Sequence, residues 1–94
     1  MKFEWDERKN QANRRKHGVD FRQAIYAFSD PFALNLPDEE HSALEDRWVL
    51  LGAAAPNRLV VVVHTDRSSG RIRIISARKA TRREHATYES RLQR

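Results

Sequence analysis

The chain has 94 residues, of which 18 are lysine or arginine and 13 are aspartate or glutamate, so its net charge is +5. This length excludes a second hydrophobic core, and residues 1–94 are expected to form a single domain. The absence of cysteine excludes disulfides, thiol nucleophiles and Cys-ligated metal sites.

No apolar run approaches the roughly 20 residues of a membrane helix, and the N-terminus carries no signal-peptide pattern, so we expect a cytoplasmic protein. Fourteen of the 18 cations are arginine. A guanidinium donates two parallel hydrogen bonds that match two oxygens of a phosphate. The composition therefore favours contact with RNA or DNA over the alternative that the excess charge only solvates the surface.

The N-terminal segment predicts a short strand and then a helix that lacks an apolar face. Residues Lys2–Trp5 alternate as an edge strand does. Asp6 can cap a helix that runs to about His17, with Gly18 at its C-terminal cap. The helix has one apolar side chain, Ala12, so hydrophobic periodicity cannot dock it. We therefore expect a polar contact to hold it, either to the sheet or to a bound phosphate.

A second helix and a short strand are predicted next. Asp20 caps this helix, and its apolar side chains share one face: Phe21, Ala24, Ile25 and Phe28. The pair Asp30-Pro31 ends it, because proline disfavours helical geometry at the residue before it. Phe32–Leu36 then predicts a strand, and the polar, acidic stretch Pro37–Asp46 predicts a mobile connection.

Three β-rich runs follow, at Arg47–Ala55, Arg58–Thr65 and Arg71–Ala77. Turn-forming residues separate them, so they predict an antiparallel meander. The middle run is apolar without alternation, which is typical of a central strand covered on both faces. The third run alternates and places Arg71 and Arg73 on one side, so one face of that strand is expected to be wet and basic.

A capping box at Thr81 and Glu84 opens a last helix that runs to about Gln93, with Tyr88 and Leu92 at core spacing. The predicted order is therefore β-α-α-β-β-β-β-α. This is an α+β fold in which helices pack against an antiparallel sheet.

Two groups of polar residues are candidates for binding RNA. Along the first helix, one broad face is shared by Asp6, Lys9, Asn13, Lys16 and His17. A second group spans the third β-rich run and the start of the last helix, and it consists of Arg71, Arg73, Ser76, Arg78, Lys79, Arg82 and Arg83. Clustered cations repel one another, so this group favours an anionic ligand. The alternative is that nearby acidic residues neutralise it.

Cleavage of RNA without a metal needs a base for the 2′-hydroxyl proton, cations for the phosphorane charge, and an acid for the leaving oxygen. The four histidines, His17, His41, His64 and His85, are candidates for the proton transfers. His85 and Glu89 have the spacing of helical metal ligands, but no third ligand follows, so we predict no metal site. No glycine-rich phosphate loop or nucleophile elbow is present, and no cofactor is predicted.

Short motifs are spread over the chain: Phe3-Glu4-Trp5-Asp6, Lys9, Asn13, Lys16-His17-Gly18-Val19, Phe21, Ala24, Asp30-Pro31, His41-Ser42, Glu45-Asp46-Arg47-Trp48, Gly52, Ile75-Ser76-Ala77-Arg78, Ala80, Glu84 and Tyr88. Their identity and spacing resemble the BrnT toxin family over nearly the whole length. The resemblance implies a RelE-like fold and an endoribonuclease whose RNA cleavage arrests growth. It also implies a cognate BrnA-like antitoxin, in a heterotetramer that binds operator DNA through the antitoxin.

The resemblance also implies site residues. The positions that match are Lys9, Asn13, Lys16, His17, Arg47, Ser76, Arg78, Glu84 and Tyr88. We expect Arg47 and Arg78 to bind the scissile phosphate. His17 or His64 is the candidate for proton transfer, and His64 is chosen for its place at a strand end, outside the motifs. Glu84 is a candidate catalytic residue, and the alternative is that it only orients Arg78. Tyr88 is a candidate for RNA binding, and the alternative is that it belongs to the core.

Two other functions fit the same sequence. One is a non-catalytic, basic module that binds nucleic acid, for which even the wild-type protein would cut no RNA. The other is a protein-interaction domain whose basic face receives an acidic partner. Failure to bind RNA at any salt concentration would favour this last function, because phosphate contacts weaken steeply with salt.

Overall fold

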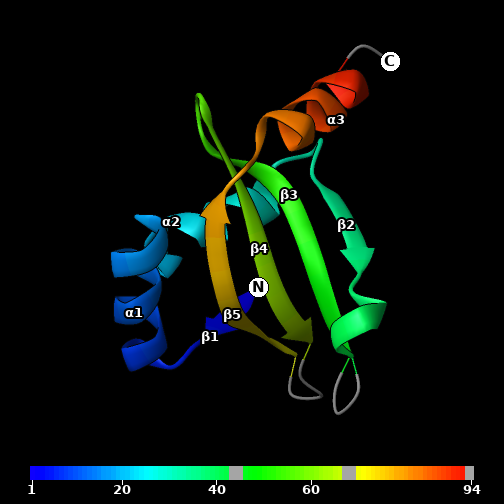
Figure 1. Ribbon diagram of the computed structural model, residues 1–94. Helices are drawn as coiled ribbons and strands as arrows, with labels where there is room; N and C mark the ends of the chain where they lie inside the picture. The colour runs from blue at the N-terminus through cyan, green and yellow to red at the C-terminus, as the bar shows by residue number, and fades with distance from the viewer. Residues whose placement is uncertain (43–45, 67–69, 93–94) are drawn as a thin grey trace.

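The computed structural model describes residues 1–42, 46–66 and 70–92 (Figure 1). In chain order its elements are β1 (Lys2–Glu4), α1 (Glu7–His17), α2 (Phe21–Ala24), the 3-10 helix η1 (Ile25–Ser29), β2 (Leu34–Pro37), the 3-10 helix η2 (Glu39–His41), β3 (Arg47–Ala55), β4 (Arg58–Asp66), β5 (Arg71–Lys79) and α3 (Arg82–Leu92). None of the described helices is long and apolar enough to cross a membrane.

Five strands form one sheet in the order β1-β5-β4-β3-β2. Strands β3 to β5 form the predicted antiparallel meander, and β2 extends it by pairing antiparallel with β3. β1 pairs in parallel with β5, where Lys2 lies opposite Arg71 and Glu4 opposite Arg73. The α+β class is confirmed, but the expectation of a wholly antiparallel sheet is wrong at β1. No hairpin turn joins β1 to β5, so local turn chemistry does not dictate their relative direction.

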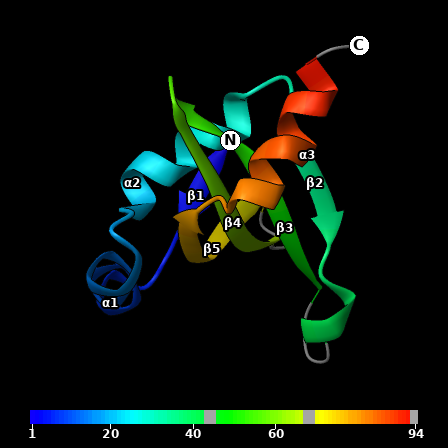
Figure 2. The same ribbon diagram turned by 45° about the horizontal axis from the view of Figure 1, so that its top comes forward.

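The two faces of the sheet are covered differently (Figure 2). On one face, helices of the first half of the chain close over the main core, whose buried residues are Val19, Phe21, Ala24, Ala27, Leu50, Val60, Val62, Ile74 and Ala77. On the other face, which we call the α3 face, a smaller cluster of Leu51, Leu59 and Val61 packs against Ala80 and Tyr88. β4 is central and buried on both faces from Leu59 to Val62, as predicted.

Hydrogen bonds dock α1 on the edge of β5. Asn13 is only 7% exposed, and its Nδ2 donates to the carbonyl oxygens of Val19 (2.9 Å) and Ala77 (2.7 Å). Its Oδ1 accepts from the Ala77 N–H (3.1 Å), so the amide pairs with β5 as a neighbouring strand would. Asn10 is also buried, and its Oδ1 accepts from the Phe21 N–H (2.9 Å). The polar contact predicted for this helix is therefore made to the sheet.

The 3-10 helix η1 is fixed against β3 at two adjoining points. At Gly52 the two elements approach so closely that a Cβ atom would lie 3.0 Å from the carbonyl oxygen of Ala27. Beside it, Oδ2 of Asp30 accepts hydrogen bonds from the Ala53 N–H (2.8 Å) and the Tyr88 hydroxyl (2.6 Å). Asp30 thus joins η1, β3 and α3 at one carboxylate.

Several boundaries differ from the prediction, and the larger differences lie between Phe21 and Asp46. The second helix is α-helical only to Ala24 and continues as η1. β2 begins at Leu34 instead of Phe32, because Oδ1 of Asp30 accepts from the Phe32 N–H (3.0 Å) and holds that residue in a turn. The predicted mobile connection contains η2, and its residues 43–45 lie outside the described part of the chain, as do 67–69 and 93–94.

Candidate active site

A bulge in β5 brings its cations to one face of the sheet. Val63 and His64 are consecutive in β4, yet they pair with Ser76 and Ile74, which leaves Ile75 without a partner. The extra residue shifts the alternation of the strand. In consequence Arg73, Ser76 and Arg78 all lie on the α3 face. In a regular strand Arg73 would lie on the opposite face, because it is three residues from Ser76 and five from Arg78. Arg71 joins them by alternation with Arg73.

Arg78 is held on this face by Glu84. Its Nη1 and Nη2 donate to the two carboxylate oxygens of Glu84 at 2.7 and 2.9 Å. Glu84 also completes the predicted capping box, since it accepts from the Thr81 N–H (2.8 Å) while its own N–H donates to the Thr81 hydroxyl (3.2 Å). The hydrogen bonds from Arg78 lower the pKa of Glu84 to about 2, so Glu84 is a weak base that keeps Arg78 in place.

The C-terminal end of α1 lies at the same end of the sheet. Nη2 of Arg58, at the start of β4, donates to the Gly18 carbonyl (3.2 Å). His17 precedes that glycine, follows the docked Asn13 by one helical turn and is partly exposed. Lys16 is exposed near the C-terminal end of α1, and Arg82 is exposed at the start of α3. We call the Arg78–Glu84 pair and the polar residues of these two helix ends the Arg78 cluster: Lys16, His17, Arg78, Arg82 and Glu84.

The other predicted cations lie at the opposite end of β5. Arg47 and Arg73 flank Thr65, their partner in β4, and Nη1 of Arg73 donates to Oε2 of Glu4 at 3.0 Å. Arg78 pairs with Val61, four residues from Thr65 in the same strand. Four residues of a strand span about 13 Å, so Arg47 and Arg78 stand at opposite ends of the α3 face, and their contact with one shared phosphate stays a prediction.

A family model described as the ribonuclease toxin BrnT of type II toxin–antitoxin systems matches residues 5–84. The chain belongs to the BrnT family. Among solved structures it is similar to the ribonuclease toxin BrnT of Brucella abortus, with 30% sequence identity and a TM-score of 0.68 over 87% of this chain and 99% of that one. No curated protein matches the chain. The resemblance read from the sequence is thereby confirmed, and type II membership implies an antitoxin and an RNA substrate.

In this BrnT-family chain, His64 lies away from the arginines. It is 2% exposed, packs on the ring of Phe28 with centroids 4.8 Å apart, and its Nε2 lies 3.1 Å from Oδ1 of Asn35. These contacts are on the main-core face, whereas Arg78 is on the α3 face. Burial also lowers the pKa of His64 and favours the neutral imidazole. The structure therefore does not bring His64 together with Arg47 or Arg78.

Two other candidates are occupied by structural hydrogen bonds. Asn13 uses both ends of its amide to dock α1. Tyr88 packs in the α3-face cluster and its hydroxyl donates to Asp30, and burial together with that carboxylate raises the pKa of Tyr88 to about 12. Lys9 remains exposed on α1. The role of Asp30 was missed, because the sequence shows it only as the residue before a proline.

Residues 1–42, 46–66 and 70–92 contain no group of three His, Asp or Glu side chains placed to hold a metal ion. His85 and Glu89 are exposed along one side of α3. The described part of the site offers guanidinium, ammonium, imidazole and carboxylate groups. These can bind phosphate and transfer protons.

Proposed function

We propose that this BrnT-family toxin is an endoribonuclease that needs no metal ion, with the Arg78 cluster as its catalytic centre. The Arg78–Glu84 pair carries the proposal. Glu84 and the Lys79 carbonyl take up three of the five N–H donors of Arg78, which leaves two for phosphate oxygens. Because Glu84 holds the guanidinium in place, Arg78 can stabilise the developing phosphorane charge without first being reoriented.

The proposed reaction is attack by the 2′-oxygen of RNA on the adjacent phosphorus. The 2′-hydroxyl loses its proton to a base, the bond from phosphorus to the 5′-oxygen of the next nucleotide breaks, and that oxygen receives a proton from an acid. The products are a 2′,3′-cyclic phosphate and a 5′-hydroxyl. We assign proton transfer to His17, because it is partly exposed at the end of the sheet where Arg78 stands. Glu84 is a positioning residue, since a carboxylate of such low pKa accepts protons poorly near neutral pH.

The remaining cations of the α3 face extend the proposed RNA path along β5. Arg71 and Arg73 stand at the far end of the strand with Arg47 two strands away, and Ser76 lies between them and Arg78. These side chains would contact phosphates on either side of the one that is cut. Such contacts add affinity that is independent of base sequence and falls with salt.

The partner we propose is a BrnA-like antitoxin that forms a heterotetramer with the toxin and binds operator DNA. The type II toxin–antitoxin family supports an antitoxin of some kind. The low apolar content of the chain adds a physical reason, because a partner that binds only the folded toxin stabilises it by mass action.

The test uses toxin purified without antitoxin and an RNA labelled at both ends, in the presence of EDTA. Wild type is expected to cut it and leave a cyclic phosphate, and an RNA with a 2′-deoxynucleotide at the cut position should resist. Arg78→Ala should lower the rate about 10²- to 10³-fold, as loss of a transition-state donor does. His17→Ala should also lower it. Arg8→Ala, an exposed arginine outside the cluster, is the matched control.

Three outcomes would contradict the proposal. Activity that disappears with EDTA and returns with a divalent cation would show a metal-dependent enzyme. Cutting of the 2′-deoxy RNA would exclude attack by the 2′-oxygen. Binding of RNA that is never cut, by wild type and Arg78→Ala alike, would favour the non-catalytic nucleic-acid-binding module.

A further inference from the structure

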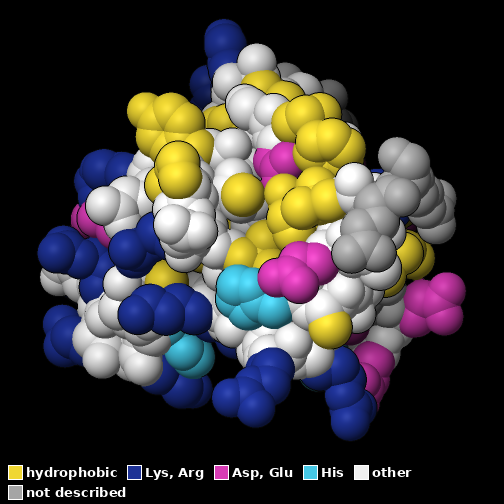
Figure 3. Space-filling model, turned by 90° about the horizontal axis from the view of Figure 1, so that it is seen from above, with side chains coloured by type: hydrophobic (Ala, Val, Ile, Leu, Met, Phe, Trp, Pro, Cys, Tyr) yellow, Lys and Arg dark blue, Asp and Glu magenta, His cyan; other side chains and the backbone are white. Residues whose placement is uncertain are grey.

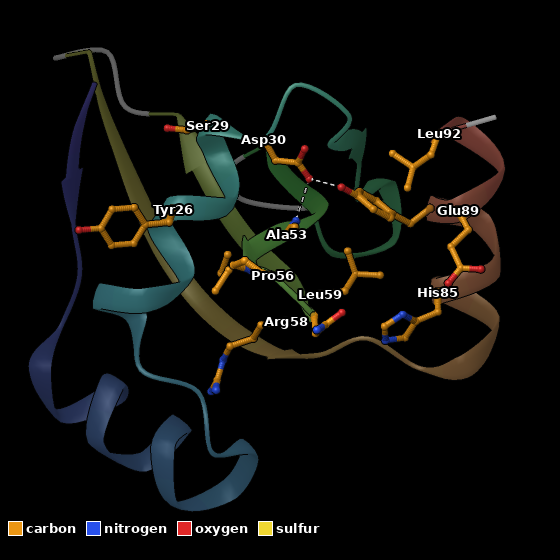
Figure 4. Close-up of a pocket in the computed structure, with 14 residues that line it drawn as sticks. Tyr26, Ser29, Asp30, Ala53, Pro56, Arg58, Leu59, His85, Glu89 and Leu92 are labelled. Atoms are coloured by element: carbon orange, nitrogen blue, oxygen red, sulfur yellow. Dashed lines mark hydrogen bonds between the residues drawn. The ribbon is translucent and has the colours of Figure 1, made fainter. Parts of the chain in front are cut away.

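A groove of about 530 Å³ lies between the β3–β4 hairpin and α3. Figure 4 shows η1 with Tyr26 and Ser29 on one side, the β3–β4 hairpin in the middle, and His85, Glu89 and Leu92 of α3 on the other side. Small and aliphatic residues form most of the hairpin wall and the floor: Ala53, Ala54, Ala55, Pro56 and Leu59. The groove is therefore apolar along the hairpin.

No described segment of the chain covers this groove. Tyr26 and Leu92, which stand at its rim, are 65% and 45% exposed. α3 presents no fully buried residue, and it turns Glu84, Tyr88 and Arg91 toward the sheet. Figure 3 shows hydrophobic side chains gathered over this surface, with lysines and arginines along its margins. Exposed apolar patches of this kind on a small protein mark interaction sites.

Charges distinguish the two ends of the groove. At one end, the groove adjoins a hollow of about 510 Å³ whose lining includes Arg58, Lys79 and His85. At the other end stand the carboxylates of Glu89 and Asp30. These carboxylates repel a phosphate backbone, and the aliphatic walls offer no stacking surface for bases, which single-stranded RNA sites use. A second copy of this chain fits poorly as well, because each copy carries a net charge of +5.

We propose that the groove receives an amphipathic segment of the antitoxin. One side of that segment is apolar and packs between the hairpin and α3, and its acidic residues meet Arg58 and Lys79. The inference rests on the proposed function through the existence of an antitoxin. His85 of the groove directly follows Glu84, which holds Arg78, so a segment seated here lies beside the Arg78 cluster. That position accounts for neutralisation of the toxin by its partner.

The test measures the dissociation constant between the purified toxin and the antitoxin encoded beside it. Leu92→Asp places a charge at the apolar rim of the groove, and Ala55→Arg fills the groove from the exposed hairpin. Each should weaken binding about tenfold or more, as loss of a buried anchor does. Leu36→Asp is the matched control, because Leu36 is similarly exposed (53%) and lies on β2, away from the groove. Lys79→Glu should weaken binding and reduce its dependence on salt.

The ribonuclease activity of wild type and of each isolated variant is measured in parallel. If the wild-type toxin cuts no RNA, the proposed function is wrong, but the binding measurement still tests the groove. Thermal unfolding confirms that the variants fold. Wild-type affinity in both Leu92→Asp and Ala55→Arg would overturn the inference. So would a wild-type dimer that Leu92→Asp converts to a monomer, since the occupant would then be a second copy. Loss of RNA binding with antitoxin binding intact would assign the groove to RNA.

Discussion

Replacing Asn13 with alanine removes the three hydrogen bonds that dock α1 on β5. The site is almost closed to water, and the Ala77 N–H and C=O and the Val19 C=O would lose their partner there. The net contribution of one such bond is about 1 kcal/mol, and a buried group left unpaired costs about 1–3 kcal/mol. The three bonds together therefore predict a loss of about 3 kcal/mol in the free energy of unfolding.

Urea unfolding at pH 7, followed by tryptophan fluorescence, measures this loss. Gln11→Ala, an exposed neighbour on the same helix, should change stability by less than about 0.5 kcal/mol. A loss below about 1 kcal/mol for Asn13→Ala would refute the reasoning. RNA affinity of the folded variant should be unchanged, and a fall in affinity with stability intact would restore Asn13 as an RNA-binding residue.

Asn13→Asp extends the same prediction to pH. The new carboxyl group would face the carbonyl oxygens of Val19 and Ala77, so its pKa in the folded protein should rise above the unfolded value of about 3.9. A raised folded pKa gives stability that is present below the unfolded pKa and is lost as pH rises through the folded one. The variant should therefore be closer to wild type at pH 4 than at pH 7.

Three further substitutions test the remaining contacts. Glu84→Gln should remove about 1–2 kcal/mol of stability at pH 7, allowing for solvent screening of its pair with Arg78. Because the pKa of Glu84 is lowered to about 2, wild type should lose this stability as pH falls from about 4.5 toward 2, and the variant should show less acid sensitivity in urea titrations. Tyr88→Phe removes the 2.6 Å hydrogen bond to Asp30 and should cost about 1–2 kcal/mol, with faster amide exchange in α3 and unchanged cleavage per folded molecule. Gly52→Ala should cost about 1–3 kcal/mol by thermal unfolding, since its Cβ would press on the η1 backbone 3.0 Å away.

Each of these has a clear contrary result. Equal acid sensitivity in wild type and Glu84→Gln would show that this carboxylate is not coupled to folding. A Tyr88→Phe variant with normal stability but little cleavage would place the hydroxyl in the reaction. A stable Gly52→Ala variant would mean that η1 can move away from β3 without loss.

Local chemistry predicted much of this fold. The capping box at Thr81 and Glu84, the N-cap at Asp6 and the C-cap at Gly18 were all read from neighbouring residues, and the structure confirms them. The meander followed from turn residues between apolar runs. The polar docking of α1 was predicted because that helix has no apolar face. The sequence did not show that Asn13 is the residue that docks it. Such features need only a few consecutive residues to be recognised.

Features that depend on distant pairing were not predictable in the same way. His64 sits in a strand without alternation, so only the register with β3 and β5 shows which face it takes. The parallel pairing of Glu4 with Arg73 joins residues from opposite ends of the chain. Asp30 contacts α3 across 58 positions of sequence, and no local pattern signals that contact.

The unpaired residue Ile75 has a consequence for how β5 can vary. Because Ile75 is an extra residue, the alternation of side chains is reversed between the two halves of the strand. Arg73 and Arg78 are five residues apart, yet both project from the same face. Deleting one residue between them would turn one of the two arginines toward the main core. Deleting or inserting two residues would leave both arginines on the α3 face. The number of residues between Arg73 and Arg78 therefore decides whether both can reach the same ligand.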